Sequence, residues 1–163
     1  MPLLDDAMHL AAWLAGSRTD AEDIVQEAML RAYKYLDRFS GAAFRPWLLA
    51  IVRNTAMTWL GRNRSAKVVF VPDVQAEAPE RDIDAGQEAS PEDALLRRDL
   101  ADQLNRAVAA LPDEFREVIV LRELHDLSYK EIAAVIDVPI GTVMSRLSRA
   151  RRLLMDALPE HAA

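Results

Sequence analysis

Apolar residues recur at helical spacing in two parts of the chain, which are separated by a stretch without such a period. In the first part apolar side chains repeat every three or four positions, which predicts three amphipathic helices. The predicted helices are residues 3–14, residues 20–37 and a segment that begins near Pro46. Thr19 and Glu22 have the spacing of a capping box at the start of the second helix. We therefore expect a three-helix bundle over residues 1–67 as a first domain.

Residues 91–163 show the same helical period and form a second predicted domain. Ser90, Pro91 and the acids that follow them are typical of a helix start, and apolar residues continue the period to Leu111. A further helix is predicted over about residues 113–123. Neither domain shows the period of two that strands require, so the predicted fold class is all-α, with two small helical domains.

The last two predicted helices have the layout of a helix-turn-helix. Ser128 and Glu131 form a capping box ahead of a short helix, and a turn around Asp137 leads to a longer basic helix that ends near Leu158. In this motif the second helix lies in the major groove of DNA and the first packs across it. One apolar stripe is expected on the buried side of the last helix, formed by Val143, Leu147, Ala150 and Leu154.

Residues 68–90, between the two domains, lack an apolar period and are strongly acidic. They contain Pro72, Pro79 and Gly86 and few large apolar side chains, which predicts a flexible linker. From Asp73 to Asp93 the chain has eight acids and one basic residue.

The net charge of the chain is −6, but its basic residues gather in two places. Residues 138–155 carry four arginines and no acid. Residues 44–67 also lack acids, and their basic residues are Arg45, Arg53, Arg62, Arg64 and Lys67. An acidic chain as a whole is atypical of nucleic-acid binding, but local basic clusters of this kind are typical of it.

Composition excludes several kinds of site. The chain has no cysteine, which rules out disulfides and thiolate metal sites, and its three histidines lack metal-ligand spacing. We therefore expect no metal and no cofactor. The N-terminal residues do not form a signal peptide, and no apolar run of about 18 residues occurs, so no membrane insertion and a cytoplasmic location are expected.

The side of the last predicted helix opposite the apolar stripe is suited to DNA. Arginine forms bidentate contacts with guanine, and serine contacts base edges. The candidate base contacts are Ser145, Ser148, Arg149 and Arg152, and the candidate phosphate contacts are Arg146 and Arg151. The alternative is a solvated surface helix, but such helices usually interleave acids with arginines.

The third predicted helix carries aromatic, basic and amide side chains opposite its core stripe. Phe44, Arg45 and Trp47 lie at its start beside the loop at residues 40–43, and the later positions are Arg53, Asn54, Met57, Gly61 and Arg64. An unstacked base can stack on an aromatic ring while cations hold its backbone. The alternative is that these aromatic residues belong to the core or its rim.

The exposed side of the second predicted helix carries Asp20, Asp23, Gln26, Glu27 and Arg31. A catalytic carboxylate pair needs a concave pocket, which an exposed helix face does not provide. A solvated face and a protein-docking face both remain open.

Several segments resemble a known family. Residues 20–33 and 44–54 resemble region 2 of bacterial extracytoplasmic-function (ECF) sigma factors. Residues 111–119, 127–134 and 139–152 resemble their region 4. The resemblance covers both predicted domains in order.

The resemblance implies a dissociable subunit of RNA polymerase that recognises two promoter elements. The implied partners are core RNA polymerase, promoter DNA and an anti-sigma factor. The polymerase-docking residues would be Asp20, Asp23, Gln26, Glu27 and Arg31. The minus-ten residues would be Phe44, Arg45, Trp47, Arg53, Asn54, Met57, Arg62 and Arg64, with the loop Ser40–Ala43 placed to capture a flipped base. The minus-thirty-five residues would be Thr142, Met144, Ser145, Arg146, Ser148, Arg149, Arg151 and Arg152.

Two other functional classes compete with this interpretation. An autonomous helix-turn-helix regulator would bind duplex DNA as a dimer at a palindromic site, but no heptad seam is present. An enzyme acting through the carboxylates of the second helix is disfavoured, because the chain lacks a glycine-rich phosphate loop and a cysteine nucleophile.

Overall fold

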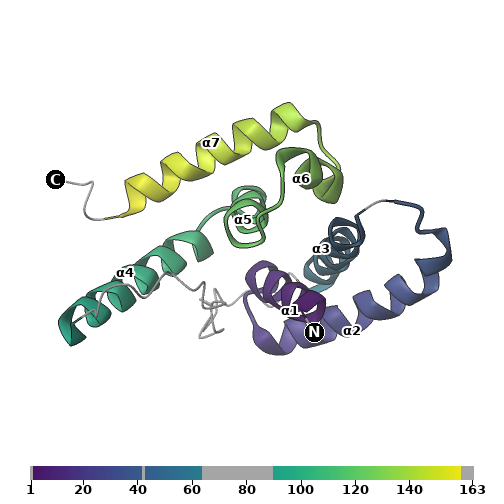
Figure 1. Cartoon of the computed structure of the whole chain (residues 1–163), viewed down its shortest axis with the longest axis horizontal. Coiled ribbons are helices and arrows are strands. Elements are labelled where there is room, and N and C mark those ends of the chain that lie inside the picture. Colours follow the sequence, from purple (N-terminus) through teal and green to yellow (C-terminus); the bar gives the residue numbers. More distant parts are fainter. Residues whose placement is uncertain (1, 42, 64–89, 159–163) are drawn as a thin grey trace.

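The computed structural model describes residues 2–41, 43–63 and 90–158. Within these ranges the regular elements are all helical, which agrees with the expected all-α class (Figure 1). The predicted linker lies outside the described residues except for Ser90.

The first domain is a bundle of three long helices. These are α1 (Pro2–Ala15), α2 (Arg18–Tyr35) and α3 (Phe44–Asn63), and a short 3-10 turn, η1 (Leu36–Arg38), follows α2. Each helix contacts the other two. Leu10, Ile24, Leu49 and Val52 are fully buried between them, where the apolar faces of the three helices meet.

The start of α2 differs from the prediction. Ser17, in an extended conformation, is the N-cap, and its side chain accepts a hydrogen bond of 3.3 Å from the backbone N–H of Asp20. Gly16 precedes it at φ 74, the left-handed conformation that ends α1. The predicted capping box at Thr19 is therefore wrong, because the turn at Gly16 starts the helix earlier.

The second domain contains α4 (Pro91–Ala109), α5 (Asp113–Ile119), a π-helical turn η3 (Val120–Leu124), α6 (Tyr129–Ile136) and α7 (Ile140–Ala157). Both predicted caps are present: Ser90 accepts from Asp93, and Ser128 and Glu131 form a complete capping box. Asp137 ends α6 at φ 56, so the turn of the helix-turn-helix forms as predicted.

Helix α4 is more exposed than its apolar period suggests. Leu95, Leu96, Leu100 and Leu104 are exposed, and only Val108, in its last turn, is buried within the helix. The helix projects away from the rest of the protein (Figure 1).

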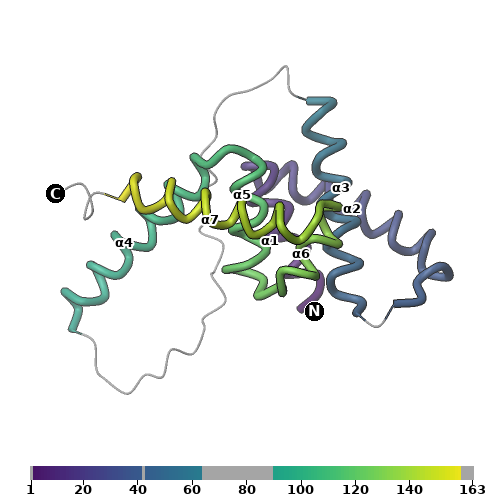
Figure 2. Tube along the Cα trace, turned by 90° about the horizontal axis from the view of Figure 1, so that it is seen from above, coloured from purple at the N-terminus to yellow at the C-terminus, as the bar shows by residue number. Residues whose placement is uncertain are grey.

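The two domains pack directly against each other. Helix α3 contacts α6, and α1 contacts α5 and η3. The buried residues of both domains form one continuous cluster. Figure 2 shows the same arrangement from above, with α6 beside α3. The sequence predicted two domains joined by a flexible linker and did not indicate this contact.

Candidate nucleic-acid interface

Helix α7 has two distinct sides. Val143, Leu147 and Ala150 are fully buried, as predicted, while Leu154 is only partly buried. On the other side Ser145, Ser148, Arg149 and Arg152 are exposed, with Met144 also exposed beside them and Thr142 half-buried near the helix start. A polar, basic face of this kind on the second helix of a helix-turn-helix is the geometry that contacts base edges in the major groove.

The four arginines of α7 differ in how their side chains are held. Arg146 lies 3.9 Å from Glu114 and 4.0 Å from Glu117, both on α5. Arg151 donates a 3.0 Å hydrogen bond to Glu123, which raises the pKa of Arg151 above its ordinary value. Arg149 lies over the ring of Phe115, 5.7 Å from its centre. Arg152 makes no ion pair within the described part of the chain.

An aromatic cluster lies at the start of α3. Phe44 and Trp47 are 5.3 Å apart between ring centres, and Phe39 lies 5.5 Å from Phe44 and 5.1 Å from Trp47. In the sequence, Phe39 continues the apolar period of the second predicted helix, which predicts that its ring joins the core. The chain instead leaves α2 through η1 before Phe39, which turns this ring toward α3.

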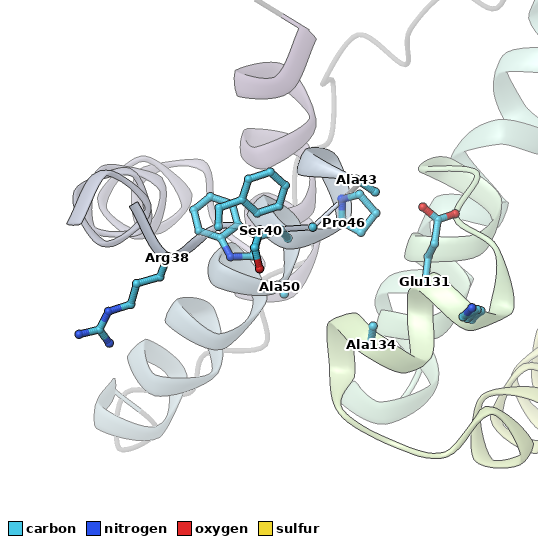
Figure 3. Close-up of a pocket in the computed structure, with 11 residues that line it drawn as sticks. Arg38, Ser40, Ala43, Pro46, Ala50, Glu131 and Ala134 are labelled. Carbon is cyan, nitrogen blue, oxygen red and sulfur yellow. The ribbon is translucent and has the colours of Figure 1, made fainter. Parts of the chain in front are cut away.

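The cluster borders a pocket of about 520 Å³ between the domains. Its walls include Arg38, Phe39 and Trp47 from the first domain and Lys130 and Glu131 from α6. In Figure 3 the labelled side chains of Glu131 and Ala134 lie across the pocket from those of Ser40 and Pro46. The loop that was predicted to lie beside the aromatic residues does so at Ser40, Gly41 and Ala43, and residue 42 lies outside the described residues.

Two arginines that were predicted to face DNA are bound to the second domain. Arg53 donates two hydrogen bonds to the buried carboxylate of Glu117, at 2.9 and 3.1 Å. Arg45 donates one bond of 2.7 Å to Asp6 and one of 2.6 Å to the backbone carbonyl of His125. The sequence could not reveal these contacts, since Arg53 and Glu117 belong to different domains.

The remaining candidates on α3 are more accessible. Asn54 and Arg62 are exposed, and Met57 is half-buried. Arg64 lies outside the described residues.

The predicted docking face on α2 lies at the surface. Asp23 and Gln26 are exposed, and Asp20 is half-buried. Glu27 and Arg31 form a 2.6 Å ion pair, and Arg31 also donates to Thr55 of α3 at 3.4 Å, which fixes its side chain.

Two large residues on α2 extend this face and were not singled out from the sequence. Leu30 is 68% exposed and Tyr33 is 82% exposed. They follow Gln26 at the i+4 and i+7 positions, so they lie on the same side of the helix. Both residues are large and apolar but lie off the apolar stripe of α2. This is the signal in the sequence by which a contact surface could have been found.

The fold brings together two histidines that are far apart in sequence. His9 Nδ1 lies 3.4 Å from His125 Nε2. Among the residues that the structure describes, no group of three or more histidine or acidic side chains is arranged to hold a metal ion. None of the described helices combines the length and apolarity needed to cross a membrane.

Comparison with known proteins identifies the family. The family described as "Sigma-70 region 2" matches residues 2–66, and "Sigma-70, region 4" matches residues 101–154. The "ECF RNA polymerase sigma-E factor" of Escherichia coli strain K12 is 41% identical over 137 residues, which cover 83% of this chain and 72% of that protein. The chain belongs to the ECF sigma factor family. It is an RNA polymerase sigma factor, which binds core polymerase and directs promoter-specific initiation of transcription.

Other similar proteins agree with this assignment. The "RNA polymerase sigma-H factor" of Pseudomonas aeruginosa is 39% identical over 141 residues, which cover 85% of this sigma factor and 73% of that one. The solved sigma factor RpoE, in complex with the anti-sigma factor NepR from Bartonella quintana, has a TM-score of 0.69 at 26% identity over 97% of this chain and 92% of that one. The solved structure of CnrH in complex with the cytosolic domain of CnrY has a TM-score of 0.63 at 26% identity, over 95% of this chain and 81% of that one. These matches do not favour an autonomous DNA-binding regulator.

Proposed function

We propose that this sigma factor divides promoter recognition between its two domains. The observation that carries this proposal is the two-sided helix α7, whose exposed side bears Ser145, Ser148, Arg149 and Arg152. These residues contact bases of the minus-thirty-five element. Arg146 and Arg151, which are held by acidic partners, contact the flanking phosphates. Thr142 and Met144, at the helix start, lie against the same element.

The first domain opens and recognises the minus-ten element. The aromatic cluster of Phe39, Phe44 and Trp47 offers ring faces on which an unstacked base can stack. The loop at Ser40 lines the neighbouring pocket and holds a flipped base there. Arg45, Arg53, Asn54, Met57, Arg62 and Arg64 hold the strand beside it.

Helix α2 docks on core polymerase. The exposed apolar residues Leu30 and Tyr33 support this role, because large apolar side chains next to polar ones are typical of a protein interface. The polar part of the docking face comprises Asp20, Asp23, Gln26, Glu27 and Arg31. This surface binds protein, so the carboxylates of α2 take no catalytic part.

An anti-sigma factor is the proposed regulator. One similar solved structure is a complex of the sigma factor RpoE with the anti-sigma factor NepR, and another is a complex of CnrH with the cytosolic domain of CnrY. The exposed leucines of α4 offer this sigma factor an apolar surface for such a partner. Since polymerase and promoter DNA lie in the bacterial cytoplasm, the factor acts there.

Reconstituted transcription tests this function. The purified chain is mixed with core RNA polymerase and genomic DNA, and the transcripts and the bound DNA are sequenced. We expect transcripts that start a fixed distance downstream of a shared pair of promoter elements. Tight binding to palindromic duplex DNA without polymerase, and no specific transcript, would instead support the autonomous regulator.

A further inference from the structure

The second domain engages part of the surface that this sigma factor would use for the minus-ten element. Arg53 is bonded to Glu117 of α5, Arg45 is bonded to the carbonyl of His125 directly after η3, and α6 forms one wall of the aromatic pocket. We propose that the two domains of the free chain mask each other, and that the paired histidines His9 and His125 make this closed form sensitive to acid. Three contacts hold this closed form.

The ion pair between Arg53 and Glu117 is the strongest of these contacts. It is bidentate, and the side chain of Glu117 is only 3% exposed while that of Arg53 is 21% exposed. A carboxylate this deeply buried needs a cationic partner, because leaving it unpaired is strongly unfavourable. Arg146 approaches the same carboxylate only at 4.0 Å. Arg53 therefore supplies the direct hydrogen bonds to Glu117 in the closed form, and DNA would have to compete for it.

Arg45 forms the second contact. Its guanidinium joins Asp6 of α1 to the carbonyl of His125, so that one side chain bridges the two domains. The carbonyl is directed there by the end of the π-helical turn, where Asp126 adopts φ 54 and reverses the chain. In the closed form two N–H donors of Arg45 are therefore already bonded to other residues of the protein.

The third contact covers the aromatic pocket. Lys130, Glu131 and Ala134 of α6 lie opposite the wall formed by Phe39 and Trp47 (Figure 3). The pocket is therefore shared between the domains, and its shape changes when α6 moves away.

The histidine pair lies next to the Arg45 contact. The rings of His9 and His125 are 5.2 Å apart between centres, and His125 is only 2% exposed. Their 3.4 Å contact requires one nitrogen to be a donor and the other to be an unprotonated acceptor. The charged groups that face them are Asp6 from α1 and Arg45 from α3, and Asp126 follows His125 in the chain. The carboxylate of Asp6 is already bonded to Arg45, so it is shared between two basic groups.

The direction of the acid effect follows from burial. Burial lowers the pKa of His9, and burial followed by repulsion from His9 lowers the pKa of His125 from 6.5 to about 4. Both imidazoles return to water when the domains separate, so the open form binds protons more tightly. The closed form therefore keeps its full stability above about pH 6.5 and loses it as the pH falls toward 4.

The separation of the domains can be measured without DNA or polymerase. The chain has no cysteine, so dyes can be attached at Lys34→Cys on α2 and Met155→Cys on α7, both exposed positions. Energy transfer between the dyes then reports the ratio of open to closed molecules. The functional meaning of masking rests on the proposed minus-ten role. The distance between the two dyes does not depend on that role. A failure of transcription and a failure of masking are therefore distinguishable.

The first test removes the buried charge. Glu117→Gln keeps the size of the side chain but breaks the ion pair with Arg53, and we expect the ratio of open to closed molecules to rise at least about tenfold at pH 7.5. Glu22→Gln is the matched control, because it removes an exposed ion pair with Arg18 that lies within α2. Circular dichroism checks that both variants keep their helices. Equal energy transfer in Glu117→Gln and in the unsubstituted chain would overturn the masking.

The second test changes pH. Between pH 7.5 and pH 5 we expect the open ratio of the unsubstituted chain to rise about tenfold, since each unit of pKa difference contributes up to tenfold. The double variant His9→Gln and His125→Gln should change less than twofold over this range, because neither side chain titrates. An equal pH response in the double variant would overturn the role of the histidines.

If the double variant stays open at every pH, a direct titration of the two histidines still tests their role. The imidazole signals of His9 and His125 are followed by nuclear magnetic resonance in the unsubstituted chain and in Glu117→Gln. We expect both pKa values to lie lower in the unsubstituted chain than in the opened variant. Equal pKa values in the two proteins would show that opening is not coupled to these protons, and would overturn the acid sensitivity.

Discussion

The side chain of Arg149 is held by an aromatic ring of its own domain before any DNA is bound. Its guanidinium stacks over Phe115, so its position on the surface of α7 is held from within the second domain. A stacked guanidinium loses less conformational freedom when it binds than a freely moving one does. Arg149 is therefore better prepared than Arg152 for a directional contact with a base.

Replacing Arg149 by Ala should relax sequence preference as well as weaken binding. We expect a loss of about 1–3 kcal/mol that is confined to one or two positions of the minus-thirty-five element, because a bidentate contact distinguishes one base pair from the others. Binding of the polymerase complex to promoters with each base substituted measures this. Arg152→Ala is the comparison, and a loss that is uniform across all promoters would show that Arg149 only contacts phosphate.

At the scale of elements, α2 and α6 depend on local interactions in different ways. Helix α6 has only eight residues (Tyr129–Ile136) and begins with a complete capping box. A helix this short gains little from propagation, so its cap and its packing against α7 keep it formed. Helix α2 is 18 residues long and is held on one side by the bundle, which leaves its other side available for a partner.

The cap of α6 should contribute measurably to the stability of the second domain. Ser128→Ala removes the acceptor for the Glu131 N–H, a 3.1 Å bond, and we expect a loss of about 0.5–2 kcal/mol in the free energy of unfolding. Urea denaturation followed by circular dichroism measures the loss. Ser90→Ala removes a similar 3.2 Å bond at the exposed start of α4 and should cost less, because that end of α4 has few packed neighbours to lose. Equal losses would contradict this account.

The docking face of α2 can be tested separately from the fold. Gln26→Ala combined with Glu27→Arg should abolish binding to core polymerase while leaving the fold intact, because both side chains lie away from the buried stripe. The new charge at position 27 also repels Arg31, its partner in the present ion pair. Native gel electrophoresis with core polymerase measures the complex, and Asp99→Arg on the exposed surface of α4 controls for a change in net charge. A loss of helicity in the double variant would instead show that these residues stabilise the fold.

At the scale of the whole molecule, the two domains share one continuous core cluster. Leu127 and Ile132 of the second domain and Leu10 and Leu49 of the first belong to this cluster and are almost fully buried. Unfolding and separation of the domains are therefore linked, and a buried titratable group between them affects both.

The free energy of unfolding should fall in mild acid. His125 has its pKa lowered to about 4 in the folded chain, against 6.5 when exposed, so folding opposes its protonation. The resulting stability is fully present above about pH 6.5 and decreases as the pH falls toward 4, by roughly 1–3 kcal/mol at pH 5. Urea denaturation at pH 7.5 and pH 5 measures the difference. The same decrease in His125→Gln would assign it to other groups.

Residues within one or two helical turns of each other were enough to predict most of the helices. The apolar period, Ser90, the capping box at Ser128 and the left-handed residue Asp137 all act through neighbours in the chain, so their effect is visible in the sequence. The same reason explains why the two-sided character of α7 was predicted correctly. The error at Thr19 was also local, because Ser17 and Thr19 are both suitable caps and the turn at Gly16 decided between them.

Packing between distant segments decided the rest. Whether a leucine is covered depends on which other helix reaches it, so the exposure of Leu96 and Leu100, which lie on the apolar period of α4, could not be inferred from periodicity. The contacts of Arg53 with Glu117 and of His9 with His125 join residues that are 64 and 116 positions apart. A sequence pattern specifies which face of a helix is apolar, but only the packed structure determines which partner that face and its charged neighbours meet.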